Sequence, residues 1–289
     1  MRPREEVLIH SHSRRAHWVA AQAAALARIP HVATVHQPLP VHLFSRIFPC
    51  LGDHTIAIDE AIHDHLRKHF ARGIRRLSLV RNGIDLSHGN ALVGSLPSEN
   101  RLLVLGRLTG GRWRALLFFF NVLKRTAATL QPTRFEVVGR IPPERAEDLR
   151  LQVEDVNRTI HPSSVETHDF VEDLSPLLAR CRGVIAGGRS ALEGMAAGRP
   201  VIALGERGVV GLCNVETWPE AMRTNFGDHF DTAADHFYPV KLEWGLRQLT
   251  GKDPRMSELG RWGRAQLEKH YNIQTIAPEI EKIYEGLRR

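Results

Sequence analysis

The stretch that decides the fold is Gly183-Val-Ile-Ala-Gly-Gly-Arg-Ser-Ala-Leu-Glu-Gly-Met-Ala-Ala-Gly-Arg-Pro-Val-Ile202. Its pattern predicts a buried strand, a tight glycine turn, a short helix, a glycine stop and a second strand. Gly187 and Gly188 let the backbone turn sharply and approach a ligand closely. Ser190 is expected to open the helix and Gly198 to end it. The N–H groups at such a helix start form an anion site, for which a nucleotide phosphate is the natural ligand.

A second interpretation of this segment is purely local. Ser190-Ala-Leu-Glu193 has the sequence of a capping box, with Ser190 at the N-cap and Glu193 three residues later. Glu193 would then close its own helix instead of binding a ligand. The spacing alone leaves both roles open.

The composition is that of a folded protein with an excess of basic residues. The 289 residues, 43% of them apolar, suffice for one large or two ordinary domains. A net charge of +7 fits nucleic acid, an anionic membrane surface or phosphorylated ligands as partners. The basic residues are scattered and not interleaved with aromatic ones, so we do not expect nucleic-acid binding.

The lack of recognisable targeting signals and the spacing of the cysteines predict a cytoplasmic protein. No apolar run approaches the roughly 18 residues of a transmembrane helix, and the N-terminus lacks a signal-peptide core. Cys50, Cys181 and Cys213 are far apart and form no CxxC pair, which predicts reduced thiols rather than a disulfide framework or a zinc knuckle. We therefore expect a cytoplasmic protein, with room for a peripheral position at the inner membrane face.

Strand-like and helix-like segments alternate along the chain, which predicts parallel sheets with helices on their faces. The polar segment 91–100 interrupts the alternation and reads as an interdomain linker. The segment 208–211 has the glycine content of a flexible loop. Strands are expected at 7–9, 31–35, 55–58, 77–80, 101–105, 135–138, 159–160, 168–171, 184–186 and 201–204, and helices at 14–28, 41–48, 59–70, 112–129, 142–156, 173–180 and in at least three pieces from 233.

Five local patterns occur in the order found in family 4 glycosyltransferases, and the resemblance covers most of the chain. They resemble a strand ending in histidine, the "A-x-S-E-A-I" helix start, the "P-N-G-I-D" turn, "G-R-L-x-x-x-K", and "L-E-A-M-A-x-G-x-P-V". In this sequence they are Val32-Ala-Thr-Val-His-Gln37, Ala57-Ile-Asp-Glu-Ala-Ile62, Val80-Arg-Asn-Gly-Ile-Asp85, Leu105-Gly-Arg-Leu-Thr-Gly-Gly-Arg112 and Leu192-Glu-Gly-Met-Ala-Ala-Gly-Arg-Pro-Val201.

The resemblance implies a GT-B fold, in which two Rossmann-like domains face each other across a cleft. Residues 1–98 would form the acceptor-side domain, 99–268 the nucleotide-sugar-binding domain, and 269–289 a helix crossing back to the first domain. The implied reaction moves a sugar from a nucleotide diphosphate-sugar to a glycan or lipid-linked acceptor. It would proceed with retention and need neither a metal nor another cofactor.

Physical chemistry supports particular roles for two arginines. Sugar transfer from a diphosphate builds negative charge on the leaving phosphate, which cations and N–H donors must stabilise. Arg107 and Arg112 follow a predicted strand and could reach one diphosphate, with Arg112 at the family's lysine position. Arginine grips phosphate with two parallel hydrogen bonds, so that exchange is chemically reasonable. Without the resemblance, both would be read as solvated loop charges.

The other site residues are carried over from the family pattern. Glu193 would accept hydrogen bonds from the nucleotide ribose, and His36 would lie near the transferred sugar, although a loop histidine is the plain alternative. His10 and His12 share a strand face, but no acidic or cysteine partner is near in sequence, so no metal site is expected. The donor phosphates would lie against Gly106 and the helix start at Gly188, Arg189, Ser190 and Ala191.

The chain departs from the family pattern in two places. Many members carry a first glutamate eight positions before the second, but Ile185 occupies that position here. Arg189 or the backbone must then contact the sugar, which leaves the donor open. Fewer than 100 residues precede the predicted linker, whereas a full domain has roughly 150. The first domain is therefore shorter than the family pattern implies.

The short first domain leaves several interpretations open. The chain is a fragment, starts at a misassigned residue, or is a truncated member. An incomplete sheet exposes an edge and favours oligomer formation. A non-catalytic nucleotide-binding remnant and a nucleotide-sugar epimerase of the same architecture are the alternative functions.

Overall fold

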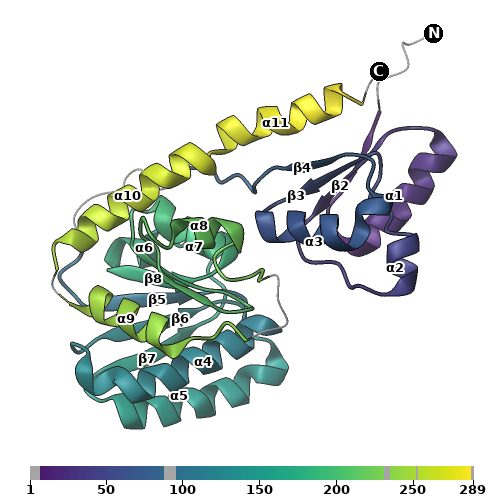
Figure 1. Ribbon diagram of the computed structural model, residues 1–289. Helices are drawn as coiled ribbons and strands as arrows, with labels where there is room; N and C mark the ends of the chain where they lie inside the picture. The colour runs from purple at the N-terminus through teal and green to yellow at the C-terminus, as the bar shows by residue number, and fades with distance from the viewer. Residues whose placement is uncertain (1–6, 88–95, 231–234, 252, 288–289) are drawn as a thin grey trace. The chain divides into compact units, whose positions relative to one another are not determined.

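The computed structural model describes residues 7–87, 96–230, 235–251 and 253–287. The chain divides into two compact units, drawn in Figure 1. The first unit combines residues 1–85 with 271–289, and the second unit is continuous from 86 to 270. Both are layered α/β structures, so the predicted fold class is confirmed. The first half of the predicted linker, residues 91–95, lies outside the described residues.

The first unit alternates strands with helices and ends with a helix from the far end of the chain. Its elements are β1 (Ile9–Ser11), α1 (Arg14–Ala27), β2 (His31–Val35), α2 (Leu43–Ile47), β3 (His54–Ala57), α3 (Glu60–Phe70), the 3₁₀ helix η1 (Ala71–Gly73), β4 (Leu77–Leu79) and α11 (Ile273–Glu285).

The first sheet is parallel and runs in the order β1-β2-β3-β4. Successive side chains of a strand point to opposite faces. Ala33 and Ala57 pack on one face with residues of α3, while Val32 and Ile56 pack on the other with α11. Asp59 caps α3 as predicted, since its carboxylate accepts a hydrogen bond from the Ile62 N–H at 2.8 Å. The last helix therefore completes the core of the first unit.

The second unit is larger and carries a mixed sheet. Its strands are β5 (Arg101–Leu105), β6 (Arg134–Val138), β7 (Ser164–His168), β8 (Gly183–Ala186), β9 (Val201–Leu204) and β10 (Val209–Leu212). Its helices are α4 (Gly111–Thr126), η3 (Ala127–Thr129), η4 (Pro143–Arg145), α5 (Ala146–Ile160), α6 (Ser175–Arg180), α7 (Gly188–Ala196), α8 (Trp218–Arg223), α9 (Pro239–Thr250) and α10 (Arg255–His270).

The strand order of the second sheet is β10-β9-β8-β5-β6-β7, and only β10 is antiparallel to its neighbour. The chain leaves β5 towards β6 and β7 and then returns to β8 on the other side of β5. Helices α4, α5 and α9 cover one face, while α7 and α10 pack together on the other (Figure 1). Ligands of α/β proteins bind where the strand order reverses, which here is the carboxyl end of β5 and β8.

Three local predictions in the second unit are wrong. The expected strand at 159–160 is the last turn of α5, and the strand expected at 168–171 is β7, which ends at His168. The apolar residue Ile160 faces the core from the helix, so a short apolar run did not distinguish helix from strand. The segment 208–211 is no flexible loop, because Val209 to Leu212 form the buried strand β10.

Glycine directly follows each of four parallel strands in the second sheet. Gly106, Gly139, Gly187 and Gly205 come after β5, β6, β8 and β9. A Cβ atom built at Gly139 would lie 1.8 Å from the carbonyl oxygen of Gly106, and one at Gly205 would lie 2.1 Å from the carbonyl carbon of Gly227. Backbones at this edge of the sheet are therefore packed too closely for any side chain.

A network of buried histidines links strands and helices of the first unit. The His10 ring contacts the Tyr284 hydroxyl at 2.6 Å and the Thr34 hydroxyl at 2.7 Å. The Ser11 hydroxyl lies 2.7 Å from a ring nitrogen of His17 and 2.7 Å from one of His31. Burial, followed by repulsion from the neighbouring histidines, lowers the pKa of His10 and of His17 to about 4. The fold therefore holds these rings uncharged.

Cysteines and helices agree with the expectations that the structure can test. Cys50, Cys181 and Cys213 are all free thiols. Burial raises the pKa of the Cys181 and Cys213 thiols to about 12, so both are inert in the folded chain. Within the described part of the chain, the helices are all too short or too polar to cross a bilayer.

We predict that Gly139→Ala destabilises the second unit by about 2 kcal/mol or more, because the new methyl group meets backbone that cannot move aside. Urea unfolding followed by circular dichroism measures the effect. Gly286→Ala is the control, since its Cβ would meet atoms no closer than 3.4 Å, and a change within about 0.5 kcal/mol is expected. Equal stability of the two variants would contradict the close packing.

We predict that the first unit loses stability as the pH falls from 6.5 towards 4. The histidine pKa values near 4 lie below the ordinary 6.5, so the unfolded chain binds more protons in this range. The stabilisation is complete above pH 6.5 and is lost on acidification. Unfolding curves at pH 7.5 and 5 measure it, and His17→Gln should flatten the dependence while His63→Gln, outside the network, should not.

Candidate active site

The candidate site lies at the carboxyl ends of β5 and β8, where the strand order of the second sheet reverses. Leu105 pairs with Ala186 in the parallel register, so the loops that follow, at Gly106 and Gly187, start side by side. One loop leads into α4 and the other into α7. Two of the predicted donor-binding segments are therefore neighbours.

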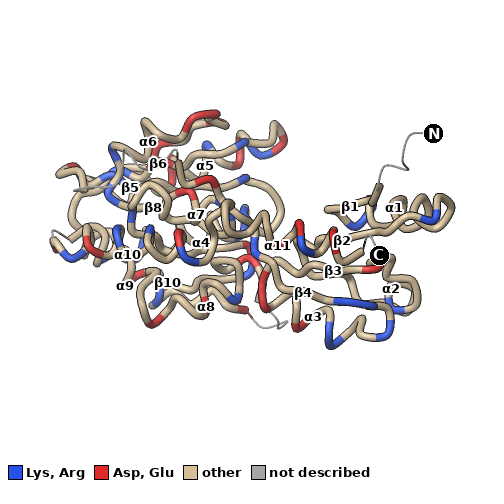
Figure 2. The backbone as a smooth tube through the Cα atoms, turned by 90° about the horizontal axis from the view of Figure 1, so that it is seen from above, with Lys and Arg blue, Asp and Glu red and all other residues tan. Residues whose placement is uncertain are grey.

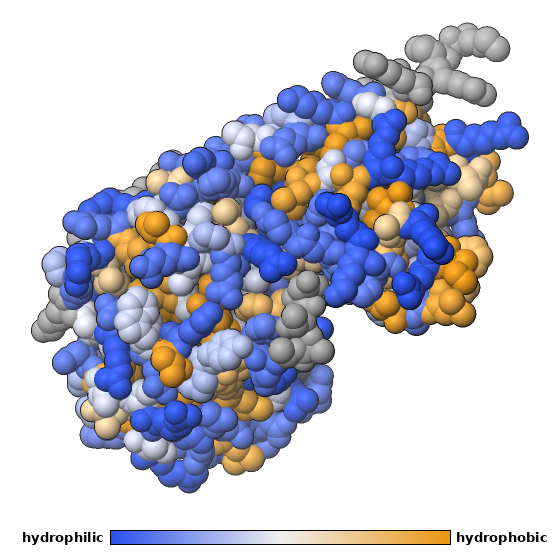
Figure 3. Space-filling model, viewed as in Figure 1, coloured by the Kyte–Doolittle hydropathy of each residue, from blue (hydrophilic) through white to orange (hydrophobic). Residues whose placement is uncertain are grey.

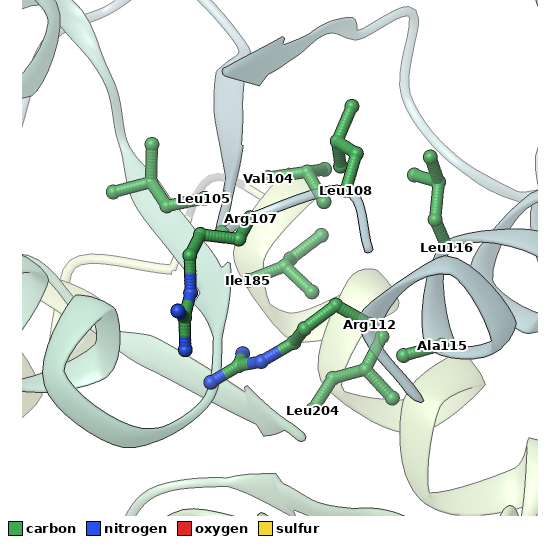
Figure 4. A pocket seen from close by; sticks show the side chains of 10 residues that line it. Val104, Leu105, Arg107, Leu108, Arg112, Ala115, Leu116, Ile185 and Leu204 are labelled. Carbon is green, nitrogen blue, oxygen red and sulfur yellow. The ribbon is translucent and has the colours of Figure 1, made fainter. Parts of the chain in front are cut away.

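A small cavity of about 30 Å³ lies beside the loop after β5, next to the first turns of α4 and to residues of β8 and β9, as Figure 4 shows. Its walls are apolar, and the only charged side chains among its lining residues are Arg107 and Arg112. In Figure 4 the two side chains come from different directions, and their guanidinium groups lie close together in this view. Arg107 and Arg112 therefore place two guanidinium groups, which are suited to bind anionic ligands, at this edge of the sheet.

Arg112 is held in place by acidic side chains of two other loops. Its Nη2 lies 2.7 Å from Oδ2 of Asp228, and its Nε lies 3.8 Å from Oε1 of Glu206. Asp228 in turn accepts a hydrogen bond from the Glu206 N–H at 3.0 Å. The side chains of Arg112 and Asp228 are only 14% and 12% exposed, so the pair is largely shielded from water.

Arg107 has a different environment. It is exposed, and the described residues offer its side chain neither an ion pair nor a hydrogen bond. Arg112 is therefore oriented by the protein, whereas Arg107 has all of its donors available for a ligand.

The start of α7 differs from the predicted capping box. The helix begins at Gly188 with Gly187 as N-cap, and no side chain caps it. Ser190 is therefore the third residue of the helix rather than its cap, and the prediction that Ser190 and Glu193 form a capping box is wrong. The glycine pair supplies the turn that a serine cap would otherwise make, since Gly188 has a φ of +52°.

This start still places N–H groups at the site. The first N–H groups of a helix have no partner within it. In α7 they belong to Gly187, Gly188, Arg189 and Ser190, while the N–H of Ala191 falls within the helical bonding pattern. The Gly188 N–H donates to the Asn225 carbonyl at 3.1 Å. Arg189 and Ser190 are the backbone donors best placed for an anion, and Ala191 is one position too far along.

Glu193 lies one turn further along α7. Its Oε1 accepts a hydrogen bond from Nε of Arg189 at 3.2 Å, and its side chain is 30% exposed. Burial raises the pKa of Glu193, and the charge of Arg189 opposes that shift. The carboxylate thus keeps open acceptor positions towards the solvent side of the helix.

His36 belongs to the first unit and follows β2 directly, the position predicted for it. Its Nε2 lies 3.2 Å from Nδ1 of His12, which follows β1. The rings of His10 and His12 are 4.1 Å apart between centroids, but both ring nitrogens of His10 already contact hydroxyl groups. The histidines thus gather at the carboxyl edge of the first sheet.

Sequence reasoning missed the acidic partners of Arg112. Glu206 and Asp228 lie in loops for which no motif was recognised. The glycine after each of β5, β6, β8 and β9 was a signal that could have located the site edge, because closely packed backbones exclude a side chain there. No comparable signal marks Asp228, which reaches the site through a turn with left-handed residues at Asn225 and Phe226.

One group of metal-type ligands occurs among the described residues. Glu136, Glu166 and His168 bring ligand atoms within 4.8 Å of one another, at β6 and β7. Glu136 already pairs with Arg101 and with Arg180, so its charge is compensated by the protein. The group lies on the strands, away from the loops that carry Arg107 and Arg112.

Solved structures identify the fold of the chain. HepE of Anabaena, solved with UDP and glucose, has a TM-score of 0.72 and 17% identity over 97% of this chain and 78% of its own. A glycosyltransferase from Rickettsia africae also has a TM-score of 0.72, with 15% identity over 97% of this chain and 76% of its own. Sucrose-phosphate synthase of Thermosynechococcus elongatus has a TM-score of 0.68, with 18% identity over 97% of this chain and 73% of its own. The fold is therefore GT-B.

Family models give the assignment in sequence. Residues 7–88 match Glycosyltransferase Family 4, and residues 99–217 match Glycosyl transferases group 1. No curated protein sequence matches the chain. The chain belongs to the glycosyltransferases that combine these two domains, which confirms the resemblance seen in the five motifs.

We predict that Arg112 and Asp228 are energetically coupled. A double-mutant cycle with Arg112→Met and Asp228→Asn should give a coupling free energy of about 1–3 kcal/mol in urea unfolding, because the pair is shielded from water. Arg114, on the same helix as Arg112, forms the matched control pair with Asp235: Nη2 and Oδ2 are 2.6 Å apart, both side chains are 60% exposed, and they should couple by less than about 1 kcal/mol. Similar values for both pairs would refute the buried role of Asp228.

Proposed function

We propose that the chain transfers a sugar from a nucleoside diphosphate-sugar to a glycan or lipid-linked acceptor, with retention and without a metal ion. The observation that carries the proposal is the convergence of Arg107 and Arg112 beside the glycine-lined start of α7, at the switch point of the second sheet. The printed ligands of HepE, UDP with glucose and UDP-glucose, support a donor of this kind.

The proposed chemistry follows from where charge develops. When the sugar–phosphate bond breaks, negative charge grows on the leaving diphosphate. Arg107 and Arg112 can share that charge through parallel N–H···O bonds, and the Arg189 and Ser190 N–H groups at the α7 start add the helix dipole. These groups can do the work that a divalent cation does elsewhere. Transfer in the presence of EDTA, with NMR of the anomeric proton of the product, tests metal use and retention.

The remaining roles follow the same proposal. Glu193 has open acceptor positions one turn from the anion site, a suitable distance for ribose hydroxyls next to a diphosphate. The family position of the first glutamate is Ile185, which is 1% exposed in β8 and has no polar group to bind a sugar hydroxyl. Arg189, which is 70% exposed, or the backbone at Gly188 is proposed to contact the sugar. His36 is proposed as the first-unit residue that contacts the transferred sugar.

We predict that Arg107→Ala and Glu193→Ala each weaken UDP binding about tenfold or more. Each removes a hydrogen bond to a charged or polar ligand group, worth roughly 1.5–3 kcal/mol. Isothermal titration calorimetry measures the affinity, and thermal unfolding checks that the variants stay folded. Arg114→Ala is the control, because this arginine is 60% exposed on the same helix as Arg112 but pairs with Asp235. Unchanged affinity in both test variants would sink the donor-site assignment.

A further inference from the structure

The surface of the first unit around α2 is apolar although it faces water. Leu43 is 77% exposed, Ile47 57%, Phe48 55% and Phe44 53%, and no residue of α2 is buried. Phe44 stacks on Trp18 of α1 with 5.0 Å between the ring centroids. Figure 3 shows these orange side chains gathered over α2. Four large exposed apolar residues within six positions are far more than scattered surface residues and indicate a contact surface.

The same surface is hollowed and basic. A cavity of about 610 Å³ lies between α2 and the end of α3 with η1. Arg46, Lys68 and Arg72 line it together with His69, and no acidic residue does. Figure 2 shows the blue segments around α2 and the end of α3. Positive charge and apolar side chains therefore border one hollow.

The three cations are not used by the fold. All are exposed, and none has an ion pair or side-chain hydrogen bond with the described residues. Lys68 lies in the last turn of α3, where the helix dipole favours a positive charge. That explanation does not extend to Arg46, on a short helix, or to Arg72, in η1. Their charges are therefore available to an anionic partner.

We propose that this surface docks the first unit onto an anionic lipid bilayer. Arg46, Lys68 and Arg72 would bind phosphate groups of the lipid heads, and the apolar side chains of Leu43, Phe44, Ile47 and Phe48 would enter the boundary between heads and acyl chains. An interface between water and lipid offers anions and an apolar phase within one side-chain length. The proposal goes beyond the transfer reaction and does not depend on the donor site.

A protein partner fits the surface less well. Cores of protein interfaces are depleted of lysine and of uncompensated charge, because burying such charge is costly. Here cations that have no ion pair with the described residues lie beside exposed apolar residues, and no aspartate or glutamate lines the hollow. A membrane keeps the cationic heads hydrated while the apolar side chains leave water.

Vesicle sedimentation tests the proposal with the full chain. Vesicles of phosphatidylcholine with 30% phosphatidylglycerol should bind the protein, pure phosphatidylcholine should bind it at least tenfold more weakly, and salt should reverse the binding. Arg46→Gln, Lys68→Gln and Arg72→Gln together should weaken binding to the anionic vesicles about tenfold or more. Leu43→Ser with Ile47→Ser should weaken it separately, at unchanged charge.

The matched control removes equal charge elsewhere. Arg247, Arg261 and Lys269 are exposed on the second unit, and the described residues give them no ion pair. Their triple exchange for glutamine should leave vesicle binding nearly unchanged. Equal loss in both triple variants would overturn the proposal, since net charge alone would then explain binding. Absence of binding, or light scattering that shows a dimer dissolved by Leu43→Ser with Ile47→Ser without vesicle binding, would also overturn it.

Discussion

The second unit depends on close backbone packing at the carboxyl edge of its sheet. Glycine follows β5, β6, β8 and β9, and the missing Cβ atoms are what allow the loops to approach each other. This contact brings the loop with Arg107 and Arg112 against the start of α7. Cations and free N–H groups thereby share one small region, although they come from segments about 80 residues apart along the sequence. Close backbone packing therefore sets the geometry of the proposed anion site, and Arg107 and Arg112 supply its positive charge.

The two arginines of this edge are prepared differently for a ligand. Arg112 is already fixed by Asp228 and Glu206. Its side chain would therefore lose less conformational entropy when a phosphate binds. The same acidic groups also compete with an anion for the guanidinium. Arg107 has no such partner among the described residues and can follow the ligand. A diphosphate would thus meet one rigid and one adaptable cation, which suits a leaving group whose charge changes during the reaction.

Much of this architecture could be predicted from the sequence. The alternation of strands and helices gave the fold class, and β2, β5 and β9 have the predicted bounds. Asp59 was recognised as a cap because its side chain acts locally, on an N–H three residues away. The prediction for Ser190 as a helix cap was wrong because residues before it determine where the helix starts. A capping pattern of the right spacing was present, but the preceding glycine pair turned the chain first, and the N-cap is Gly187, three residues before Ser190. Long-range partners such as Asp228 leave no local pattern at all.

The assignment of α11 to the first unit has a consequence for biosynthesis. The first sheet needs residues from both ends of the described chain, since Val32 and Ile56 are covered by side chains of α11. The second unit is continuous and can fold as soon as residue 270 has left the ribosome. Most of the first unit is translated first, but one face of its sheet stays uncovered until α11 has been synthesised. The nascent chain therefore completes its units in the reverse of the order in which they are begun.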